Sequence, residues 1–516
     1  MTNNPYGGVK LRRAFMHFAT GKSIGAAIGI GWLLLLVREL SLSDYGIYVT
    51  FTAYLNIFVV VGSFGLIPIA ERYVPELRVS SSSHTLISLL IKIVMARLVL
   101  LVITCLGVSF FSASISSSLI TTTDVSTAFI IFQLVVFGEA LCRYIEIIFD
   151  SLLHQKYSQI STIFRYGLRF SALIASAFFF ENELDLFTWI VIEAVCMSLG
   201  CVLTLMLMWR VVYKLRDGES VSDTVTEDKL EYRRYIRYSA PTYFSRIVAS
   251  LSGIEMAKLV VVRLLGLEAA AVFSFCASLA VIFQRYLPSF LLMSMVRPLF
   301  ITALQADNPE KRLNFLFSIM IKLNVFLILP VLSVMTVIGG QVIDVLSNHK
   351  IIGGGLITVF LLGFVMTQAV RIAYSMILAS LEDGKGSLVS MLIAAALFYT
   401  SILFVPSIGS FALIIGLILA DFSVMAIAKY RINIKSYRLG FPFVGIGKLL
   451  IVTAVTTLFI SAIISSLSTY GQYGQIFVVG LVVIVLYPLL AWLISPFSQE
   501  ERSAINRMLP IRVFVW

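Results

Sequence analysis

The chain has 516 residues, of which 59% are hydrophobic and 13% are charged, and its mean hydropathy is +0.96. Soluble globular proteins are about 45–50% apolar and about 25% charged. The composition therefore excludes a soluble globular protein. Because a membrane span needs about 20 apolar residues, it predicts an all-α polytopic membrane protein. The formal net charge is +11.

Fourteen apolar runs of membrane-spanning length follow one another along the chain, separated by short polar connections. The longest connection covers residues 209–239 and carries charges of both signs. Pro288 lies inside the eighth run and predicts a kink there. The predicted spans are 19–37, 47–67, 86–111, 125–148, 158–180, 186–208, 240–262, 269–296, 313–337, 355–380, 387–405, 409–428, 446–467 and 475–495.

The positions of Lys and Arg predict how the spans are oriented, because cytoplasmic loops carry an excess of these residues. With the N-terminal tail placed inside, the cytoplasmic segments hold 23 of the 39 basic residues. The outside segments hold three, namely Arg38, Arg263 and Lys350. This asymmetry predicts that both termini lie in the cytoplasm.

The remaining 13 basic residues lie inside the predicted spans, where only five acids accompany them. A charged side chain at the bilayer centre costs about 2.5–3.5 kcal/mol to insert, so these residues must pair, reach an interface or face water. Lys22, Arg297 and Lys448 lie near the cytoplasmic edge, where we expect snorkelling. The five acids are Glu139, Glu146, Glu193, Glu255 and Asp421.

Two groups of these charges have partners at helical spacing. Glu139, Arg143 and Glu146 recur at i, i+4 and i+7 on one span, and Glu255 precedes Lys258 by three residues on another. Side chains at such spacings share a helix face and attract one another. We therefore expect ion pairs within both groups.

Other basic residues lack an acid at helical spacing. Such residues predict a solvated cationic cavity, which attracts anions. The planar donor fork of Arg suits phosphate, so the pattern predicts a pathway for a phosphate-bearing substrate. The residues assigned to this cavity are Arg97, Arg165, Arg169, Arg285, Lys322 and Arg371.

An internal repeat predicts the domain organisation. At an offset of about 225 residues, Arg72 aligns with Arg297, and Arg97 aligns with Lys322. Two parallel lobes related by an axis along the membrane normal are a recurring transporter plan. We expect an N-terminal lobe, a cytoplasmic linker, a C-terminal lobe, and two peripheral spans with a cytoplasmic tail, at 1–208, 209–239, 240–438 and 439–516.

The sequence gives no sign of a cofactor or of a catalytic centre. It contains no GxxxxGK[ST] loop and no HExxH motif, and its five Cys and four His show no metal-ligand spacing. We therefore expect a protein that is not an enzyme, that binds no cofactor or metal, and that has no nucleic-acid partner.

Four short motifs mark the N-terminal region: Arg38 to Leu40, Asp44 to Tyr48, Phe64 to Leu66 and Arg72 to Glu76. With these motifs, the region resembles the Wzx-type flippases of the polysaccharide biosynthesis family, which belongs to the multidrug/oligosaccharidyl-lipid/polysaccharide exporter superfamily. The resemblance is clearest over residues 10–80 and otherwise rests on the number of spans. It implies two six-helix lobes plus two peripheral helices.

The resemblance also implies a function. Members of this family move polyprenyl-diphosphate-linked oligosaccharides, such as O-antigen (lipopolysaccharide), capsule or exopolysaccharide repeat units. The movement is from the inner to the outer leaflet of the bacterial cytoplasmic (inner) membrane, by alternating access. Glu139 or Glu255 is the candidate to bind a coupled H⁺ or Na⁺, and a polysaccharide polymerase is a candidate partner protein within the lipid bilayer.

Three other functions fit parts of the pattern. A cation-coupled multidrug exporter of the same superfamily would have an acidic cavity, which the positive surplus disfavours. A membrane glycosyltransferase or glycan polymerase would need a large outside loop with catalytic residues. The longest outside stretch, residues 338–354, holds only Asp344, His349 and Lys350 as ionisable groups. A pure scaffold would leave the intramembrane charges without a purpose.

Overall fold

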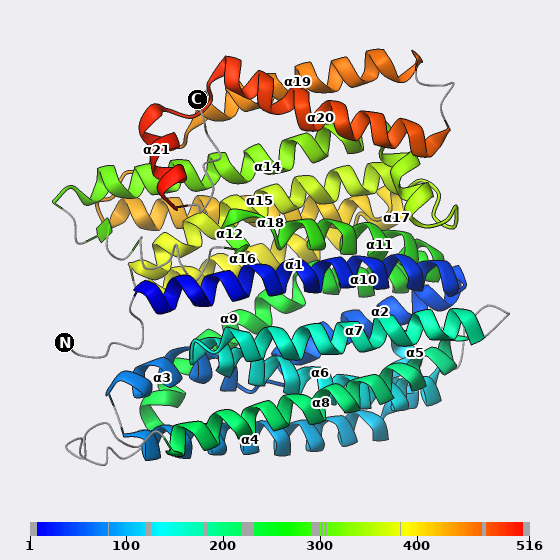
Figure 1. The fold of residues 1–516 in the computed structure, drawn as a ribbon, viewed down its shortest axis with the longest axis vertical. Helices are drawn as coiled ribbons and strands as arrows, with labels where there is room; N and C mark the ends of the chain where they lie inside the picture. The colour runs from blue at the N-terminus through cyan, green and yellow to red at the C-terminus, as the bar shows by residue number, and fades with distance from the viewer. Residues whose placement is uncertain are drawn as a thin grey trace. The chain divides into compact units, whose positions relative to one another are not determined.

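The computed structural model describes residues 8–80, 82–119, 125–179, 184–217, 232–291, 300, 303–304, 307–381, 383–466 and 471–508. Every regular element in these ranges is a helix, which confirms the predicted all-α class (Figure 1). The helices are α1 (Gly8–Glu39), α2 (Leu42–Val61), α3 (Leu66–Ser80), α4 (Ser83–Phe110), α5 (Ser112–Leu119), α6 (Ser126–Ser151), α7 (Gln155–Phe179), α8 (Leu186–Asp217), α9 (Tyr232–Leu251), α10 (Ile254–Leu265), α11 (Leu267–Gln284), α12 (Pro288–Leu291), α14 (Pro309–Leu346), α15 (Gly354–Ser380), α16 (Gly384–Ile402), α17 (Val405–Ile408), α18 (Phe411–Ile434), α19 (Phe443–Ile464), α20 (Gln472–Ile494) and α21 (Gln499–Met508).

Eleven helices in the described part of the chain are long and apolar enough to cross a membrane: α2, α4, α6, α8, α11, α14, α15, α16, α18, α19 and α20. The other three predicted spans coincide with α1, with α7, and with α9 and α10 together. The last of these is interrupted, because α9 ends at Leu251 and α10 begins after the extended Gly253. The predicted kink at Pro288 is a break between α11 and α12.

The connection between α2 and α3 is a tight turn. Helix α2 begins at Ser41, whose hydroxyl oxygen accepts a hydrogen bond from the backbone N–H of Asp44 at 3.1 Å. It ends at Gly62, and both Phe64 and Gly65 then have left-handed backbone angles, with φ of 46° and 80°. A glycine reaches such angles without strain. The N–H groups of Gly62 and Ser63 donate to the carbonyls of Phe58 and Val60, whereas the carbonyls of Val59 and Val61 accept hydrogen bonds from side chains of other helices.

The chain divides into two compact units between Ala271 and Val272, inside α11. In the first unit, α6 lies against α2, α3, α4, α7 and α8, while α9 and α10 pack on α2 and α3. The buried aromatic rings of Phe129 and Phe132 on α6 pack against Phe51 on α2, with ring centroids 5.1 and 5.3 Å apart. The lobe boundaries predicted from the repeat stay a prediction, and most of the predicted linker falls outside the described residues.

The second unit is built around α14 and α15. Helix α14 contacts α15, α19, α20 and α21, and α15 contacts α16 and α18 (Figure 1). The rings of Phe317 and Tyr374 meet at 4.8 Å in its core. The outward side chains of α19 and α20, such as Leu458, Phe477 and Ile484, are exposed. Exposed apolar surface of this extent on helices of spanning length fits lipid contact.

Candidate functional site

A network of buried charges lies among α6, α7 and α8 in the first unit, with Glu139 at its centre. Its Oε1 accepts a hydrogen bond from Nε of Arg143 at 2.7 Å, which confirms the predicted i, i+4 pair. Its Oε2 accepts hydrogen bonds from Nη1 of Arg165 at 2.5 Å and from Nη2 of Arg169 at 3.2 Å. Glu139 is 2% exposed, so one carboxylate contacts three guanidinium groups away from water.

Arg165 joins a second carboxylate of α6 to the network. Its Nη2 lies 2.5 Å from Oε1 of Glu146, and the hydroxyls of Ser161 and Thr162 donate to the same oxygen at 2.8 and 3.0 Å. The stem of Arg165 passes close to α8 at Gly200, where a Cβ atom would lie 2.5 Å from Cγ of the arginine. A side chain at position 200 would therefore displace this arginine.

Arg169 links the network to α8 and α2. Its Nε lies 3.4 Å from Oε1 of Glu193, and the hydroxyl of Tyr48 donates to that oxygen at 3.0 Å. The sulfur of Met197 lies 3.0 Å from Nη2 of Arg169. The other carboxylate oxygen of Glu193, Oε2, is buried and accepts no hydrogen bond within the described residues.

The formal charges of this network cancel, because three arginines face three glutamates. The sequence predicts a cationic cavity here because Arg165 and Arg169 have no acid on their own span. The acids that pair with them come from other helices, α6 and α8, and the assignment of both arginines to a substrate cavity stays a prediction. Arg143 is the most exposed of the three arginines, at 37% of its side chain, and it also donates to Oδ1 of Asn56 at 2.9 Å.

Arg97 is fully buried on α4 and binds backbone carbonyl groups. It donates to the carbonyl oxygen of Gly62 through Nη1 and to that of Val59, at 3.4 Å, through Nη2. The last carbonyls of a helix lack intrahelical partners and attract positive charge. Its guanidinium carbon also lies 5.8 Å from the ring centroid of Tyr144. Within the described residues Arg97 forms no salt bridge, so the contacts indicate that it caps α2.

Lys322 is buried on α14 in the second unit and pairs with an acid that follows the last predicted span. Its Nζ donates to both carboxylate oxygens of Glu501 on α21, at 2.9 and 2.8 Å. The hydroxyl of Ser318 donates to Oε1 of Glu501 at 2.8 Å, and the backbone N–H of Ser498 donates to Oε2 at 2.8 Å. Lys322 thus has no acid at helical spacing, as expected, but it has a partner far along the chain, and its assignment to a substrate cavity stays a prediction.

Arg371 and Arg285, also in the second unit, differ in their environments. Nε of Arg371 on α15 lies 2.7 Å from Oδ1 of Asp421 on α18, and the side chain of Arg371 keeps 21% exposure. Arg285, between α11 and α12, is exposed, and among the described residues no salt bridge includes it. A hydrogen bond between Gln284 and Gln368 ties the segment that carries Arg285 to the helix that carries Arg371.

The other charges selected from the sequence have varied partners. Nζ of Lys258 lies 3.0 Å from Oε2 of Glu255, which confirms the predicted i, i+3 pair. Nζ of Lys448 donates to the backbone carbonyl of Ser495 at 3.1 Å. Arg297 and the side chain of Lys22 fall outside the described residues.

Tyr48, Asn56 and Glu501 were not predicted as functional residues, yet each contacts one of the charged groups described above. Helical spacing identifies partners on one helix only, so it contains no signal for contacts between helices. One signal was present in the sequence: the fourth to sixth predicted spans together hold as many acids as arginines, which indicates that they could pair. In the described part of the chain, no three His, Cys, Asp or Glu side chains gather as a metal site would require.

Comparison with known protein families identifies the chain. The family described as "Polysaccharide biosynthesis protein" matches residues 11–302, which is more than half of the sequence. The chain belongs to this family. The resemblance noted in residues 10–80 is thereby confirmed. No curated protein sequence matches this family member.

Solved structures of transporters share the fold of this polysaccharide biosynthesis family member. The lipid II flippase MurJ in an inward closed conformation is 13% identical with a TM-score of 0.65, over 95% of this chain and 99% of that chain. An inward-facing multidrug resistance MATE family transporter of the MOP superfamily is 12% identical with a TM-score of 0.58, over 81% and 98%. MATE in a bent conformation is 15% identical with a TM-score of 0.57, over 82% and 96%. These similarities confirm the predicted fold.

Proposed function

We propose that this protein is a flippase for a polyprenyl-diphosphate-linked oligosaccharide, such as an O-antigen, capsule or exopolysaccharide repeat unit. It moves this lipid from the inner to the outer leaflet by alternating access and catalyses no covalent reaction. Membership of the polysaccharide biosynthesis family carries the proposal. The fold that it shares with a lipid II flippase supports it, because both the glycan and the diphosphate need a polar path past apolar helices.

In this proposal, the diphosphate first binds two arginines that keep solvent exposure: Arg285, which no salt bridge among the described residues includes, and Arg371, which pairs with Asp421 alone. Arg285 is exposed and would bind without displacing an acid. Arg371 is partly exposed, and the bond between Gln284 and Gln368 links the two segments that carry these arginines. Two guanidinium groups can form several charge-assisted hydrogen bonds with a diphosphate. Arg285 and Arg371 are therefore the proposed diphosphate site.

Arg165 and Arg169 have a different role in the proposal, because three glutamates already neutralise the network that contains them. A proton or Na⁺ bound at Glu139 would weaken its contacts with three arginines and change how α6, α7 and α8 hold together. The unused Oε2 of Glu193 is a second acceptor in the same network. We therefore propose that this network binds the coupled ion. Glu255 is the weaker candidate, because it forms a single ion pair, with Lys258.

The charge distribution supports the proposed location. The excess of Lys and Arg in alternate connections supports a cytoplasmic position for both termini. The proposed location is the bacterial inner membrane, in keeping with a role in polysaccharide biosynthesis. A polysaccharide polymerase, which would use the delivered repeat unit on the outer face, is the proposed partner protein.

One structural observation favours the second candidate function, which is that of a cation-coupled multidrug exporter. The charges of the largest buried network cancel, so the cationic surplus expected around Arg165 and Arg169 is smaller than the sequence suggests. The shared fold with MATE transporters fits either function. The substrate must therefore be tested directly.

The test is ligand binding by purified protein in nanodiscs. Three ligands are compared: undecaprenyl diphosphate carrying a short glycan, undecaprenyl monophosphate and a cationic dye. We expect preference for the diphosphate, and a loss of affinity of about tenfold or more in Arg285→Ala, as for a lost charge-assisted bond. Arg263→Ala, which removes another exposed arginine at the end of α10, is the matched control and should bind as the wild type does.

A leaflet-access assay then separates binding from transport. Arg169→Ala should keep diphosphate binding and lose flipping, since it alters the proposed coupling network. Binding of the dye with indifference to the diphosphate would contradict the flippase proposal and favour drug export.

A further inference from the structure

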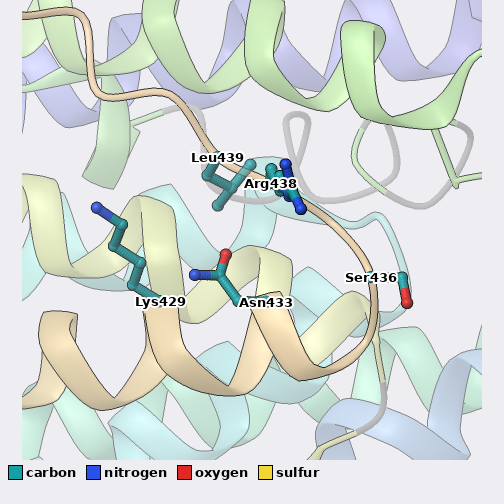
Figure 2. A pocket seen from close by; sticks show the side chains of 5 residues that line it. All are labelled: Lys429, Asn433, Ser436, Arg438 and Leu439. Carbon is teal, nitrogen blue, oxygen red and sulfur yellow. The ribbon is translucent and has the colours of Figure 1, made fainter.

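A polar cavity opens at the end of α18 in the second unit. It has a volume of about 620 Å³ and is lined by Lys429, Asn433, Ser436, Arg438 and Leu439 (Figure 2). Lys429 and Asn433 belong to α18, and the other three lie on the segment that leads to α19. Binding sites for small ligands have volumes of about 300–1,000 Å³, so the cavity is large enough to hold one.

The backbone around this cavity is held in place. The side-chain amide of Asn314 on α14 donates to the carbonyl oxygen of Arg438 at 2.8 Å and accepts from the N–H of Gly440 at 2.7 Å. Between these two bonds, the side chain of Leu439 is buried. Ser436 has a left-handed φ of 67°, which turns the chain away from the end of α18. The cavity is therefore framed by a fixed turn.

The cations that line the cavity form no salt bridge within the described residues, whereas two neighbouring cations have hydrogen-bond partners in the protein. Arg431 forms two hydrogen bonds with Asp383, at 2.7 and 2.8 Å, and Lys435 donates to the carbonyl of Leu381 at 2.5 Å. Lys429 and Arg438 are exposed, and no salt bridge in the described part of the chain includes either. Two positive charges therefore face this cavity without a counter-charge.

We propose that this cavity binds the phosphodiester headgroup of an anionic phospholipid. Basic pockets between helices near the membrane surface bind anionic headgroups. Arg438 offers a planar fork of donors and Lys429 a mobile point charge. The amide of Asn433 and the hydroxyl of Ser436 add hydrogen-bond donors for the phosphate and glycerol oxygens.

Apolar side chains beside the cavity favour a lipid over a free phosphate ion. Ile434 directly follows a lining residue on α18, and Phe443 and Val444 begin α19 just after the lining segment. All three are exposed, at 59%, 73% and 78%. In a membrane protein such surfaces face acyl chains. The headgroup of one lipid can therefore bind in the polar cavity while its acyl chains contact these apolar side chains. The headgroup would lie in the cytoplasmic leaflet under the proposed orientation, whatever substrate the protein transports.

Native mass spectrometry of the purified full chain tests the proposal. The protein in detergent is titrated with phosphatidylglycerol, with phosphatidylcholine of the same chains, and with inorganic phosphate. The variant Lys429→Gln/Arg438→Gln is compared with Lys311→Gln/Arg312→Gln, which removes two exposed cations near the start of α14 and leaves the cavity intact. The variant Arg438→Glu is a second test of the cavity itself. Thermal melting without added lipid checks that all variants fold.

We expect wild type to retain phosphatidylglycerol at least fivefold better than phosphatidylcholine. Both cavity variants should lose this preference, and the control pair should keep it. Equal retention of phosphatidylglycerol by the folded cavity variants would overturn the site. Binding of inorganic phosphate that equals that of the lipid, or no preference of wild type between the two lipids, would overturn the lipid assignment.

Discussion

Nζ of Lys322 lies 2.9 and 2.8 Å from the two carboxylate oxygens of Glu501, although 179 residues separate them in the sequence. This ion pair holds α21 against α14. The apolar side chains of Phe497 and Ile505 pack beside it against Ile319. The C-terminal helix is therefore part of the second unit.

Replacing Glu501 with Gln should destabilise the protein. The change leaves the ammonium group of Lys322 buried and unpaired, and removal of one partner of a buried ion pair costs about 3–5 kcal/mol. Thermal unfolding in detergent measures the effect. Glu500→Gln removes the neighbouring, exposed carboxylate and should unfold as wild type does. The double variant Lys322→Met/Glu501→Gln should regain most of the loss, and equal melting of Glu501→Gln and wild type would contradict the role of the pair.

The same pair predicts sensitivity to acid. Burial raises the pKa of Glu501, but the hydrogen bonds from Lys322, Ser498 and Ser318 and the charge of Lys322 together lower it more, so the net pKa lies below its ordinary value. The pair therefore contributes its full stability above the unfolded pKa of about 4.3. That stability is lost as the pH falls below this value. Melting curves between pH 6 and pH 3.5 should show a steeper loss in wild type than in the double variant.

Glu139→Gln tests the neutral network of the first unit. The substitution leaves three arginines with two carboxylates, so one buried positive charge loses its compensation. We expect a loss of about 3–5 kcal/mol in stability. Glu139→Gln/Arg169→Gln restores the balance of charge and should recover part of it. A single variant that melts at the wild-type temperature would show that water or lipid already reaches these groups.

Arg97→Lys distinguishes a helix cap from a substrate ligand. Lysine keeps the charge but cannot bind the carbonyls of Val59 and Gly62 with two parallel donors. We expect a loss of about 2 kcal/mol, as for a hydrogen bond to a charged group, and faster hydrogen exchange in the last turn of α2. Weakened diphosphate binding with unchanged stability and exchange would instead place Arg97 in the substrate site, as the sequence suggested.

His154, between α6 and α7, should make stability depend on pH. Burial, together with the positive charges of Arg78 and Lys214, lowers its pKa to about 4. A lowered histidine pKa contributes stability that is complete above the unfolded value of about 6.5 and is lost as the pH falls towards 4. Partial exposure screens the effect, so we expect about 1 kcal/mol between pH 7.5 and pH 4.5. His154→Gln should lack this part of the pH dependence in melting experiments, whereas a control at the exposed His84 should retain it.

Most of the fold could be predicted from the sequence, because a sufficiently long apolar run is nearly enough to identify a membrane span. The exceptions have local causes. Helix α7 carries Lys156, Arg165 and Arg169, which make it less apolar than its neighbours, and residues 252–253 interrupt the span formed by α9 and α10. Both were still predicted, at 158–180 and 240–262, because each contains an apolar run of spanning length.

The partners in an ion pair could be predicted from the sequence only where both residues lie on one helix. Helical spacing identified the pairs of Glu139 with Arg143 and of Glu255 with Lys258. It could not identify Glu193 as a partner of Arg169, because packing between helices brings them together. Surplus charge counted along a sequence therefore overestimates the charge that a cavity presents to its substrate.

The order in which the ion-pair partners are synthesised bears on membrane insertion. Glu139 and Glu146 precede Arg165 and Arg169 by about one span, so the acids are in place when the arginines of α7 leave the ribosome. Lys322, in contrast, is synthesised before its partner Glu501. At about 5–20 residues per second, the 179 residues to Glu501 take on the order of 10–40 s to make. During that interval α14 holds an unpaired ammonium group, which reaches its partner only when the last helix folds back.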